Sequence, residues 1–308
     1  MIKISVQTGG AEEALGIDGA YNIDGAYRLI AESGFDAVDA NIDHLVSCAD
    51  IRNKKIPAYL TGDNIDMELL RPWKDAALKY GLDNYQAHAP FPSYLLNEPE
   101  YNDVIIKMLR NTIRGCDYIG CRNLVIHPFY NSYANRMDPK TEWEVNIERY
   151  SALIPVAKEY GVTICLENVF TIFRNKAMAA ICSNPDEACR YIDTLNDIAG
   201  EKCFGFCLDT GHLLLVGGDI INTIAKLGDR IAAFHVHDNN GITDQHLAPY
   251  MGVQDWDAFI DGLRAIRFDK TLSFETFNVW NVVDKELCPA MLKFIAETGR
   301  MFAKRAAI

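Results

Sequence analysis

Short apolar runs alternate along the chain with longer segments in which apolar residues recur at helical spacing. The short runs contain many β-branched and aromatic residues and are typical of buried strands, whereas the longer segments are typical of amphipathic helices. Strands are predicted at residues 3–7, 36–40, 84–88, 123–127, 163–167, 204–209, 231–237 and 271–275. Helices are predicted at residues 22–33, 65–80, 102–115, 145–160, 186–196, 219–227, 255–266 and 289–304.

Strands that alternate with helices indicate a parallel sheet, which is either open or closed into a barrel. No G-x-G-x-x-G or G-x-x-x-x-G-K motif follows any of the strands, so the usual phosphate loops of open sheets are absent. Polar residues with ligand chemistry end at least six strands, and a barrel gathers all its strand ends at one mouth. The prediction is an α/β fold, a single-domain (β/α)8 TIM barrel over residues 1–308.

The connection from Asn41 to Gly81 is longer than one strand-to-helix loop needs. If its second half is the helix at 65–80, the first half forms an extended loop over the mouth. Long loops in that position often act as lids. A surface excursion without such a role is an equal alternative.

The strand ends carry residues that bind metal ions. Histidine nitrogens and carboxylate oxygens suit manganese, zinc, cobalt or iron(II), and carboxylates also suit magnesium. Glu167 and Glu275 each follow four strand residues, and a buried carboxylate is costly unless it is paired or metal-bound. No thiolate is expected among these ends, and His44, in the long loop, is expected to be solvated. The candidate residues are His88, His127, Glu167, Asp209, His212, His235, His237, Asp244, His246 and Glu275.

Composition and charge favour a cytoplasmic enzyme. The net charge of −12, without a block of basic residues, opposes binding to nucleic acid. No run of apolar residues is long enough to cross a membrane, and the first residues, MIKISVQTGG, lack the pattern of a secretion signal. The nine cysteines include no C-x-x-C pair, which favours reduced, buried thiols.

Four motifs resemble those of the xylose isomerase-like barrel superfamily: ICLEN (164–168), GFCLDTGH (205–212), FHVHDNNGITDQHL (234–247) and SFETF (273–277). This superfamily includes sugar isomerases, ketose 3-epimerases and endonuclease IV-type enzymes. In its epimerases one metal is held by residues that match Glu167, Asp209, His235 and Glu275. The resemblance implies that the two glutamates also transfer the proton and that His212 contacts substrate oxygens.

The endonuclease branch holds three zinc ions with nine ligands. Their counterparts here are His88, His127, Glu167, Asp209, His212, His235, Asp244, His246 and Glu275, so the number of metal ions stays open. The chain departs from the family in two places. Tyr250 and Met251 replace a Gly-acid-Gly turn, and the loop after the seventh strand lacks the arginine of many epimerases. Arg174 or Lys176 is then a candidate substrate contact, although a solvated loop charge is the slightly favoured explanation of both.

The leading hypothesis is a divalent-metal-dependent isomerase or epimerase of a sugar, sugar phosphate or polyol, acting by α-proton abstraction through a metal-stabilised enediolate. The alternatives are an endonuclease IV-like multinuclear zinc phosphodiesterase and a lyase or dehydratase on the same barrel. The expected partner is a small carbohydrate, with a homodimer possible in this family. Aromatic residues near the strand ends either pack on the sugar or fill the barrel rim; these are Phe129, Phe170, Trp256, Phe277 and Trp280.

Overall fold

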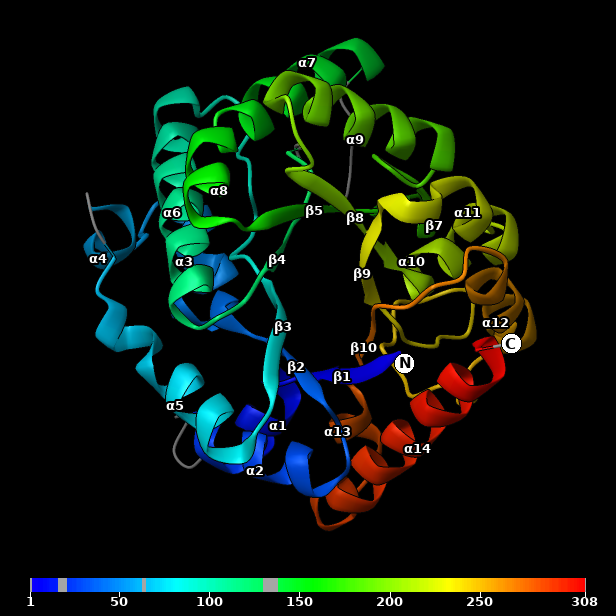
Figure 1. Ribbon diagram of the computed structural model, residues 1–308. Coiled ribbons are helices and arrows are strands. Elements are labelled where there is room, and N and C mark those ends of the chain that lie inside the picture. Colours follow the sequence, from blue (N-terminus) through cyan, green and yellow to red (C-terminus); the bar gives the residue numbers. More distant parts are fainter. Residues whose placement is uncertain (1, 16–20, 63–64, 130–137, 308) are drawn as a thin grey trace.

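The computed structural model describes residues 2–15, 21–62, 65–129 and 138–307. Parallel strands form a barrel at the centre of the molecule, and helices surround it (Figure 1). The barrel strands are β1 (Lys3–Gln7), β2 (Ala37–Ala40), β3 (Asp83–His88), β4 (Asn123–Ile126), β5 (Thr163–Glu167), β8 (Phe204–Asp209), β9 (Ile231–His235) and β10 (Thr271–Phe274). Each lies where the sequence predicts a strand, so the predicted α/β barrel is confirmed.

Neighbouring strands pair in the order β10-β1-β2-β3-β4-β5-β8-β9, and all these pairs are parallel. The barrel closes just beyond the end of β9. There, Val236 N donates to Ser273 O at 2.8 Å, and Glu275 N donates to Val236 O at 3.1 Å. Closure brings Glu275, the last predicted strand-end residue, next to β9.

The predicted helices are present, with boundaries that differ by a few residues. Asn22 caps the helix after β1 as expected, because its side chain accepts a hydrogen bond from Gly25 N at 2.8 Å. The helices that match the predictions are α2 (Ile23–Glu32), α5 (Arg71–Tyr80), α6 (Pro99–Tyr118), α7 (Pro139–Ser151), α8 (Ile154–Tyr160), α9 (Pro185–Ala199), α11 (Ile220–Leu227), α12 (Trp256–Ala265) and α14 (Cys288–Ala306).

One predicted helix is broken into two. The helix predicted at 145–160 ends at Ser151, and a second helix starts at Ile154. Pro155 explains the break, because proline lacks the N–H of an i to i−4 hydrogen bond and its ring would clash with the carbonyl of Ser151.

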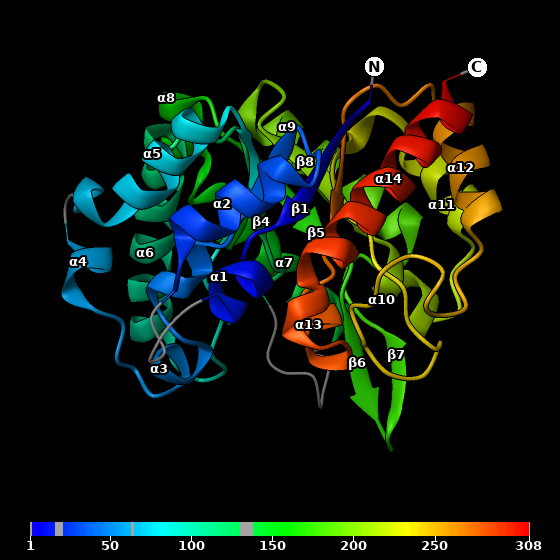
Figure 2. The same ribbon diagram turned by 90° about the horizontal axis from the view of Figure 1, so that it is seen from below.

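Several short elements were not predicted, and they lie mainly in connections that follow the strand ends. An antiparallel hairpin, β6–β7, projects beyond the barrel at the end opposite the two chain termini (Figure 2). The loop predicted at 41–64 contains short helices, and residues 63–64 are outside the described part of the chain. The elements are α1 (Gly9–Ala14), η1 (Ile42–Leu45), α3 (Cys48–Arg52), α4 (Ala58–Thr61), η2 (Met67–Leu70), β6 (Phe170–Phe173), β7 (Lys176–Ala179), α10 (Thr210–Leu215), η3 (Gly228–Arg230), α13 (Val279–Val282) and η4 (Lys285–Leu287).

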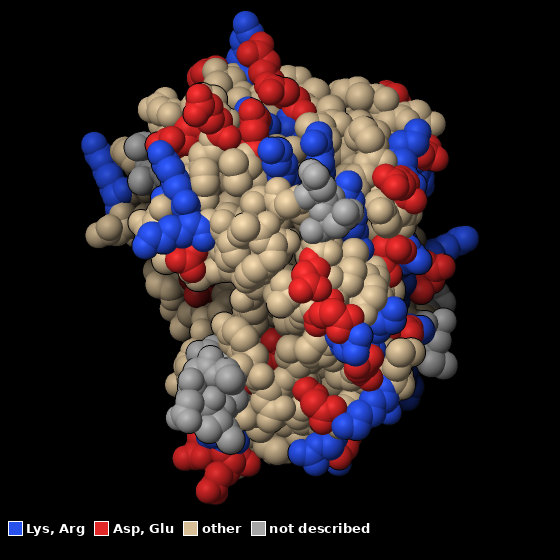
Figure 3. Space-filling model, turned by 90° about the vertical axis from the view of Figure 1, so that its left-hand side faces the viewer, with Lys and Arg blue, Asp and Glu red and all other residues tan. Residues whose placement is uncertain are grey.

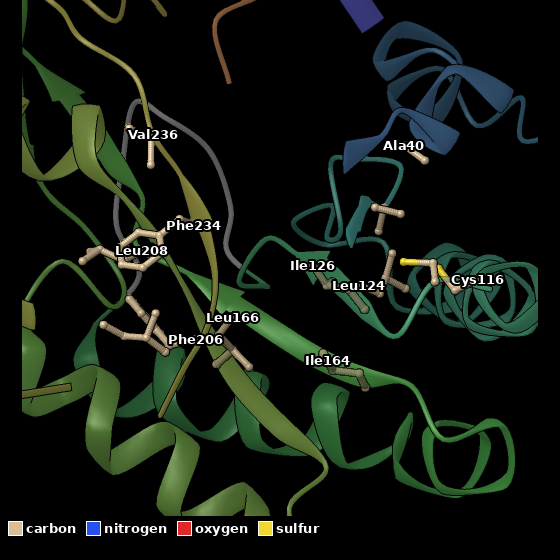
Figure 4. Packing of buried hydrophobic residues seen from close by; sticks show 14 of the residues in the cluster. Ala40, Cys116, Leu124, Ile126, Ile164, Leu166, Phe206, Leu208, Phe234 and Val236 are labelled. Atoms are coloured by element: carbon tan, nitrogen blue, oxygen red, sulfur yellow. The ribbon is translucent and has the colours of Figure 1, made fainter. Parts of the chain in front are cut away.

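The core has two layers because side chains alternate across each strand. Outward-facing residues such as Leu124, Leu166 and Phe234 pack in the layer between the barrel and its helices (Figure 4). A second, smaller cluster lies on the opposite faces of the strands and comprises Val125, Cys165, Cys207 and Ala233. Among the described residues, no helix has both the length and the apolar composition that a membrane span requires.

Gly299 lets α14 approach the barrel closely. A Cβ at this position would lie 2.7 Å from Ile4 Cγ2 and 2.8 Å from Phe274 Cε2. We expect Gly299→Val to lower the free energy of unfolding by about 1–3 kcal/mol through overpacking, measured by denaturant unfolding. The control is Glu297→Val, an exposed site on the same helix that has the valine side chain without the overlap. Equal effects of the two substitutions would contradict this account.

Candidate metal centre

The inward faces of the strands determine where the polar residues gather. Val125, Cys165, Cys207 and Ala233 form the inner apolar layer. Two residues further along each strand, on the same face, lie His127, Glu167, Asp209 and His235. All ten predicted site residues belong to clusters whose possible ligand atoms lie within 4.8 Å of one another, although the structure itself does not assign their roles.

The first cluster contains the four residues of the expected epimerase site: Glu167, Asp209, His235 and Glu275. His235 Nδ1 lies 2.8 Å from Glu167 Oε1 and 3.4 Å from Glu275 Oε2. Asp209 also caps α10, because its Oδ1 accepts a hydrogen bond from His212 N at 2.7 Å. The four side chains are almost completely buried, so their charges must be compensated within the cluster.

The second cluster consists of His88, His127 and Glu167. His88 Nδ1 donates to Ala89 O at 2.8 Å, which leaves the Nε2 of a neutral His88 with a lone pair. This Nε2 lies 3.1 Å from His127 Nε2, which in turn lies 3.0 Å from Glu167 Oε2. Glu167 therefore belongs to both clusters.

The third cluster is formed by His212, His237, Asp244 and His246. Asp244 Oδ2 lies 2.9 Å from His246 Nε2 and 3.4 Å from His212 Nε2. His212 Nδ1 donates to Asn168 O at 2.9 Å, so the other ring nitrogen of His212 faces Asp244. The rings of His237 and His246 stack with their centroids 4.0 Å apart.

Burial and mutual attraction act in opposite directions on the pKa values of these groups. Burial alone would raise the pKa of Glu167, but the imidazoles of His235 and His127 hold it well below its usual range. Burial alone would lower the pKa of His212, but the carboxylates of Asp209 and Asp244 raise it to about 10. Nearby carboxylates likewise raise the pKa values of His235 and His246, so these imidazoles favour the cationic form beside anionic carboxylates, whereas burial lowers the pKa of His127.

The donor set fits a divalent cation. Buried carboxylate oxygens without a hydrogen bond, Glu167 Oε2 and Asp244 Oδ1, occur in different clusters. His235 has a carboxylate at each ring nitrogen, since its Nε2 lies 3.1 Å from Asp39 Oδ2. This is the arrangement in which a carboxylate, here Asp39, orients an imidazole whose other nitrogen would be available to a cation.

Three neighbours of the clusters were missed in the sequence. Asp39, on β2, is fully buried beside His235 and accepts a hydrogen bond from Gln86 Nε2 at 2.7 Å. Gln7, the last residue of β1, donates to Glu275 Oε1 at 2.9 Å. Both lie near the C-terminal ends of their strands, as the predicted site residues do. A search for polar residues at the ends of the first two strands would therefore have found them.

The third missed neighbour is Cys207, whose sulfur lies within 4.8 Å of possible ligand atoms of Glu167 and His235. The sequence predicted no thiolate among the strand ends, and it did not place Cys207 beside them. Cys207 precedes Asp209 by two residues and shares its inward face. Burial raises the pKa of the Cys207 thiol well above its ordinary value, so the thiol stays protonated.

A cavity of about 550 Å³ opens over the clusters. Besides ligand-type residues it is lined by neutral amides and aromatic rings, and Lys285 is the one lysine or arginine among its described lining residues. The lining beyond the clusters is Gln7, Gly9, Gly10, Asn41, Asp43, His44, Phe91, Phe277, Asn278, Trp280, Asn281 and Lys285.

The five aromatic residues predicted near the strand ends have different surroundings. Phe277 and Trp280 line the cavity, whereas Phe129 and Trp256 are buried in the core. Phe170 packs edge-on against His212, with ring centroids 5.1 Å apart.

The two candidate cations for substrate contact lie away from the cavity. Arg174 and Lys176 are exposed in the β6–β7 hairpin and do not line it. Tyr250 and Met251 are exposed as well. The expectation of a solvated His44 is wrong, because this residue is part of the cavity wall and is stacked on Tyr21, with ring centroids 4.1 Å apart.

Comparison with known proteins identifies a family. The family described as "Xylose isomerase-like TIM barrel" matches residues 27–298. "Uncharacterized protein MJ1311" of Methanocaldococcus jannaschii is 27% identical over 222 residues, which are 68% of this chain and 70% of that protein. "Probable endonuclease 4" of Mycobacterium ulcerans is 24% identical over 236 residues, 71% of this chain and 84% of that protein.

Solved structures share the fold over nearly the whole chain. L-ribulose 3-epimerase has a TM-score of 0.71 at 18% identity and covers 100% of this chain and 95% of its own. The IOLI protein, crystallised with a zinc atom, has a TM-score of 0.69 at 18% identity and covers 99% of this chain and 98% of its own. At this level of identity the likeness establishes the barrel fold.

The charge separation in the clusters predicts a pH dependence of stability in the presence of a chelator. The pKa of His212 is raised from 6.5 to about 10 on folding, so its stabilising contribution is complete below pH 6.5 and is lost as the pH rises toward 10. The pKa of Glu167 is lowered from 4.5, so its contribution is present above pH 4.5 and is lost in acid. We expect the Tm of the chelated protein to be highest between these limits and to fall on the alkaline side.

Thermal unfolding of the wild type and of His212→Gln measures this effect. Glutamine at position 212 takes up no proton in this range. The Tm of the variant is therefore expected to fall less between pH 6.5 and pH 10 than that of the wild type. Parallel profiles of the two proteins over this interval would contradict the assignment to His212.

Proposed function

Because the chain belongs to the family of xylose isomerase-like TIM barrels, we propose that it is a divalent-metal-dependent isomerase or epimerase of a small carbohydrate or polyol. The proposal rests on the position of Glu167 and Glu275. Their carboxylates approach the same ring nitrogen of His235, at 2.8 and 3.4 Å, and both line the cavity. The sugar epimerases among the proteins with this fold support the same chemistry.

Four residues of the first cluster would hold the catalytic cation: Glu167, Asp209, His235 and Glu275. Three carboxylates and one imidazole suit manganese, zinc, cobalt or magnesium. When bound, such a cation supplies a Lewis acid that polarises a carbonyl group and its neighbouring hydroxyl. Asp39 would orient the imidazole of His235, since its carboxylate lies at the other ring nitrogen, Nε2.

The two glutamates are suited to proton transfer on either side of the reacting carbon. One removes the proton α to the carbonyl, and the other returns it at a neighbouring carbon or on the opposite face. Gln7 fixes one oxygen of Glu275 by donating a hydrogen bond to Oε1. The low pKa of Glu167 keeps its carboxylate ionised at neutral pH.

The cavity wall favours an uncharged, polyhydroxylated substrate. Asn41, Asn278 and Asn281 supply amides that donate to and accept from hydroxyl groups, and Phe277 and Trp280 supply apolar faces. Lys285 is the one lysine or arginine among the described lining residues, so beyond the histidines of the clusters a phosphate would find little compensation for its charge.

Exchange of the substrate α-proton with deuterated water tests the proposal across a panel of ketoses, sugar acids and inososes with manganese added. We expect Glu275→Gln to reduce the exchange rate by roughly 10²–10⁴-fold, as for loss of a general acid or base. Metal content is measured in parallel, because Glu275 is also a proposed ligand. Glu32→Gln, an exposed site on α2, is the control. Undiminished exchange in Glu275→Gln would sink the assignment.

A second candidate function is hydrolysis of a phosphodiester in abasic DNA by a multinuclear zinc site. Two observations favour it: the three ligand clusters occur side by side, and Glu167 is shared between two of them. The likeness to a probable endonuclease 4 agrees with it. The net charge of −12 opposes it. On the face seen in Figure 3, basic and acidic side chains are interspersed, and the described residues there form no continuous basic surface.

Metal stoichiometry separates the two candidates. Purified protein with one tightly bound cation per chain and carbon–proton exchange is the expected result for the isomerase or epimerase. Three zinc ions per chain, together with incision of a duplex that contains one abasic site, would replace that function with the second candidate. Plasma emission and a gel-based incision assay provide the two measurements.

A further inference from the structure

His237 is a fully buried histidine to which the proposed chemistry gives no role. It follows His235 by two residues, and its ring lies beside Asp209, which belongs to the four-residue cluster. Its Nε2 lies 3.0 Å from Asp209 Oδ1 and 3.1 Å from Asp209 Oδ2. Because the oxygens of a carboxylate only accept hydrogen bonds, the proton of a neutral imidazole in this position belongs on Nε2. The contact is therefore a hydrogen bond from the imidazole to the carboxylate.

His237 also belongs to the third cluster, and the distances show which cluster it serves. Its approach to the third cluster is through the same atom, since Nε2 lies 4.0 Å from Asp244 Oδ1, farther than from either oxygen of Asp209. The other ring nitrogen, Nδ1, is buried without a hydrogen-bond partner among the described residues. The nearest partner of His237 is thus Asp209, which indicates a role in the four-residue cluster.

The backbone fixes the imidazole and the carboxylate relative to each other. Thr210 Oγ1 accepts a hydrogen bond from His237 N at 3.1 Å and donates to His237 O at 2.9 Å. Thr210 directly follows Asp209 at the start of α10, so this pair of hydrogen bonds ties the end of β8 to the residues after β9. Gly211 leaves room for the ring, since a Cβ there would lie 1.9 Å from His237 Cε1.

The two oxygens of Asp209 have unequal partners. Oδ1 accepts from His212 N at 2.7 Å and from His237 Nε2 at 3.0 Å. Oδ2 lies 3.1 Å from His237 Nε2 and 3.5 Å from His212 Nδ1, which already donates to a backbone carbonyl. Oδ2 therefore has more capacity left for a cation. Hydrogen bonds of this kind set the orientation of a ligating carboxylate, and their partners affect metal affinity almost as strongly as the ligands themselves do.

We propose that His237 is a positioning residue of the metal centre, whose Nε2–H holds the carboxylate of Asp209 with Oδ2 turned toward the divalent cation. His237 binds neither the cation nor the substrate, and it is not among the described residues that line the cavity. The inference rests on the proposed function in one respect, because it takes Asp209 as a ligand of the cation. It requires no particular substrate.

The first test measures cobalt(II) binding to the full-length, chelator-treated protein by isothermal titration and visible absorption. His237→Leu keeps a buried side chain of similar size without the donor, and we expect cobalt at the four-residue cluster to bind roughly 10–100-fold more weakly. His237→Gln supplies an amide N–H near the position of Nε2, so it should recover the wild-type affinity and spectrum. Wild-type affinity in His237→Leu, or equal weakening in both variants, would overturn the proposal.

Histidine nitrogen NMR of the zinc-loaded wild type distinguishes a positioning residue from a metal ligand. The signal of His237 is identified by its loss in His237→Gln. We expect the proton on Nε2 of His237 to remain when zinc is bound. Loss of this proton to a zinc–nitrogen bond would overturn the proposal, as would a proton on Nδ1 in its place. The same conclusion would follow if His237→Leu bound one zinc ion fewer per chain and held the others with unchanged affinity.

A matched variant separates positioning from a merely structural role of a buried imidazole. Asn239→Ala removes the buried hydrogen bond from Asn239 Nδ2 to Gly211 O at 3.0 Å and leaves the contact between His237 and Asp209 in place. We expect it to lower the Tm of the chelated protein and to keep the wild-type cobalt affinity. In His237→Leu the rise in Tm on addition of cobalt should shrink, because weaker binding stabilises the folded state less. A loss of cobalt affinity in Asn239→Ala as large as in His237→Leu would contradict positioning.

These measurements need no turnover, so failure of the inference and failure of the proposed function are distinguishable. If no carbohydrate exchanges its α-proton but cobalt binding depends on residue 237 as described, the proposed function fails and the role of His237 stands. If α-proton exchange occurs but cobalt binds equally well to the wild type and His237→Leu, the inference fails and the proposed function stands.

Discussion

The buried carboxylate of Glu167 is the group on which the arrangement of the mouth depends. One of its oxygens lies 2.8 Å from His235 Nδ1, and the other lies 3.0 Å from His127 Nε2. A carboxylate in this position is tolerated only with such partners, because burial alone would strongly favour its neutral form. β4, which pairs with β5, and β9, which lies beyond β8 on the other side, must therefore each deliver an imidazole at matching height, which links the pairing register to the geometry of the clusters.

The same alternation of side chains builds the core and the site. Val125, Cys165, Cys207 and Ala233 fill the inside of the barrel, and the next inward position on each strand is a polar residue. A shift of one residue in any strand would exchange an inward carboxylate or imidazole for an outward apolar residue. The apolar layer thus lies directly beneath the clusters and places their side chains at the same depth in the barrel.

This regularity explains what the sequence predicts and what it does not. The eight strands and the polar residues at their ends follow from local patterns, and Asp39 and Gln7 were accessible to the same reasoning. The β6–β7 hairpin and α10 were not, because they follow strand ends where neither a period of two nor a helical period is long enough to recognise. The position of His44 depends on a contact with Glu12 between two separate connections, and such tertiary contacts leave no periodic signal.

The proposed role of Glu167 links the number of bound cations to the reaction that the site could catalyse. Its Oε1 lies 2.8 Å from His235 Nδ1, and its Oε2 lies 3.0 Å from His127 Nε2, so each oxygen faces a different cluster. If the four-residue cluster alone held a cation, the oxygen that faces His127 would remain to act as the proposed base. If His88, His127 and Glu167 held a further cation, Glu167 would serve as a ligand in both clusters and would be less able to accept a proton. The number of bound cations would therefore bear on which of the two proposed reactions the site supports.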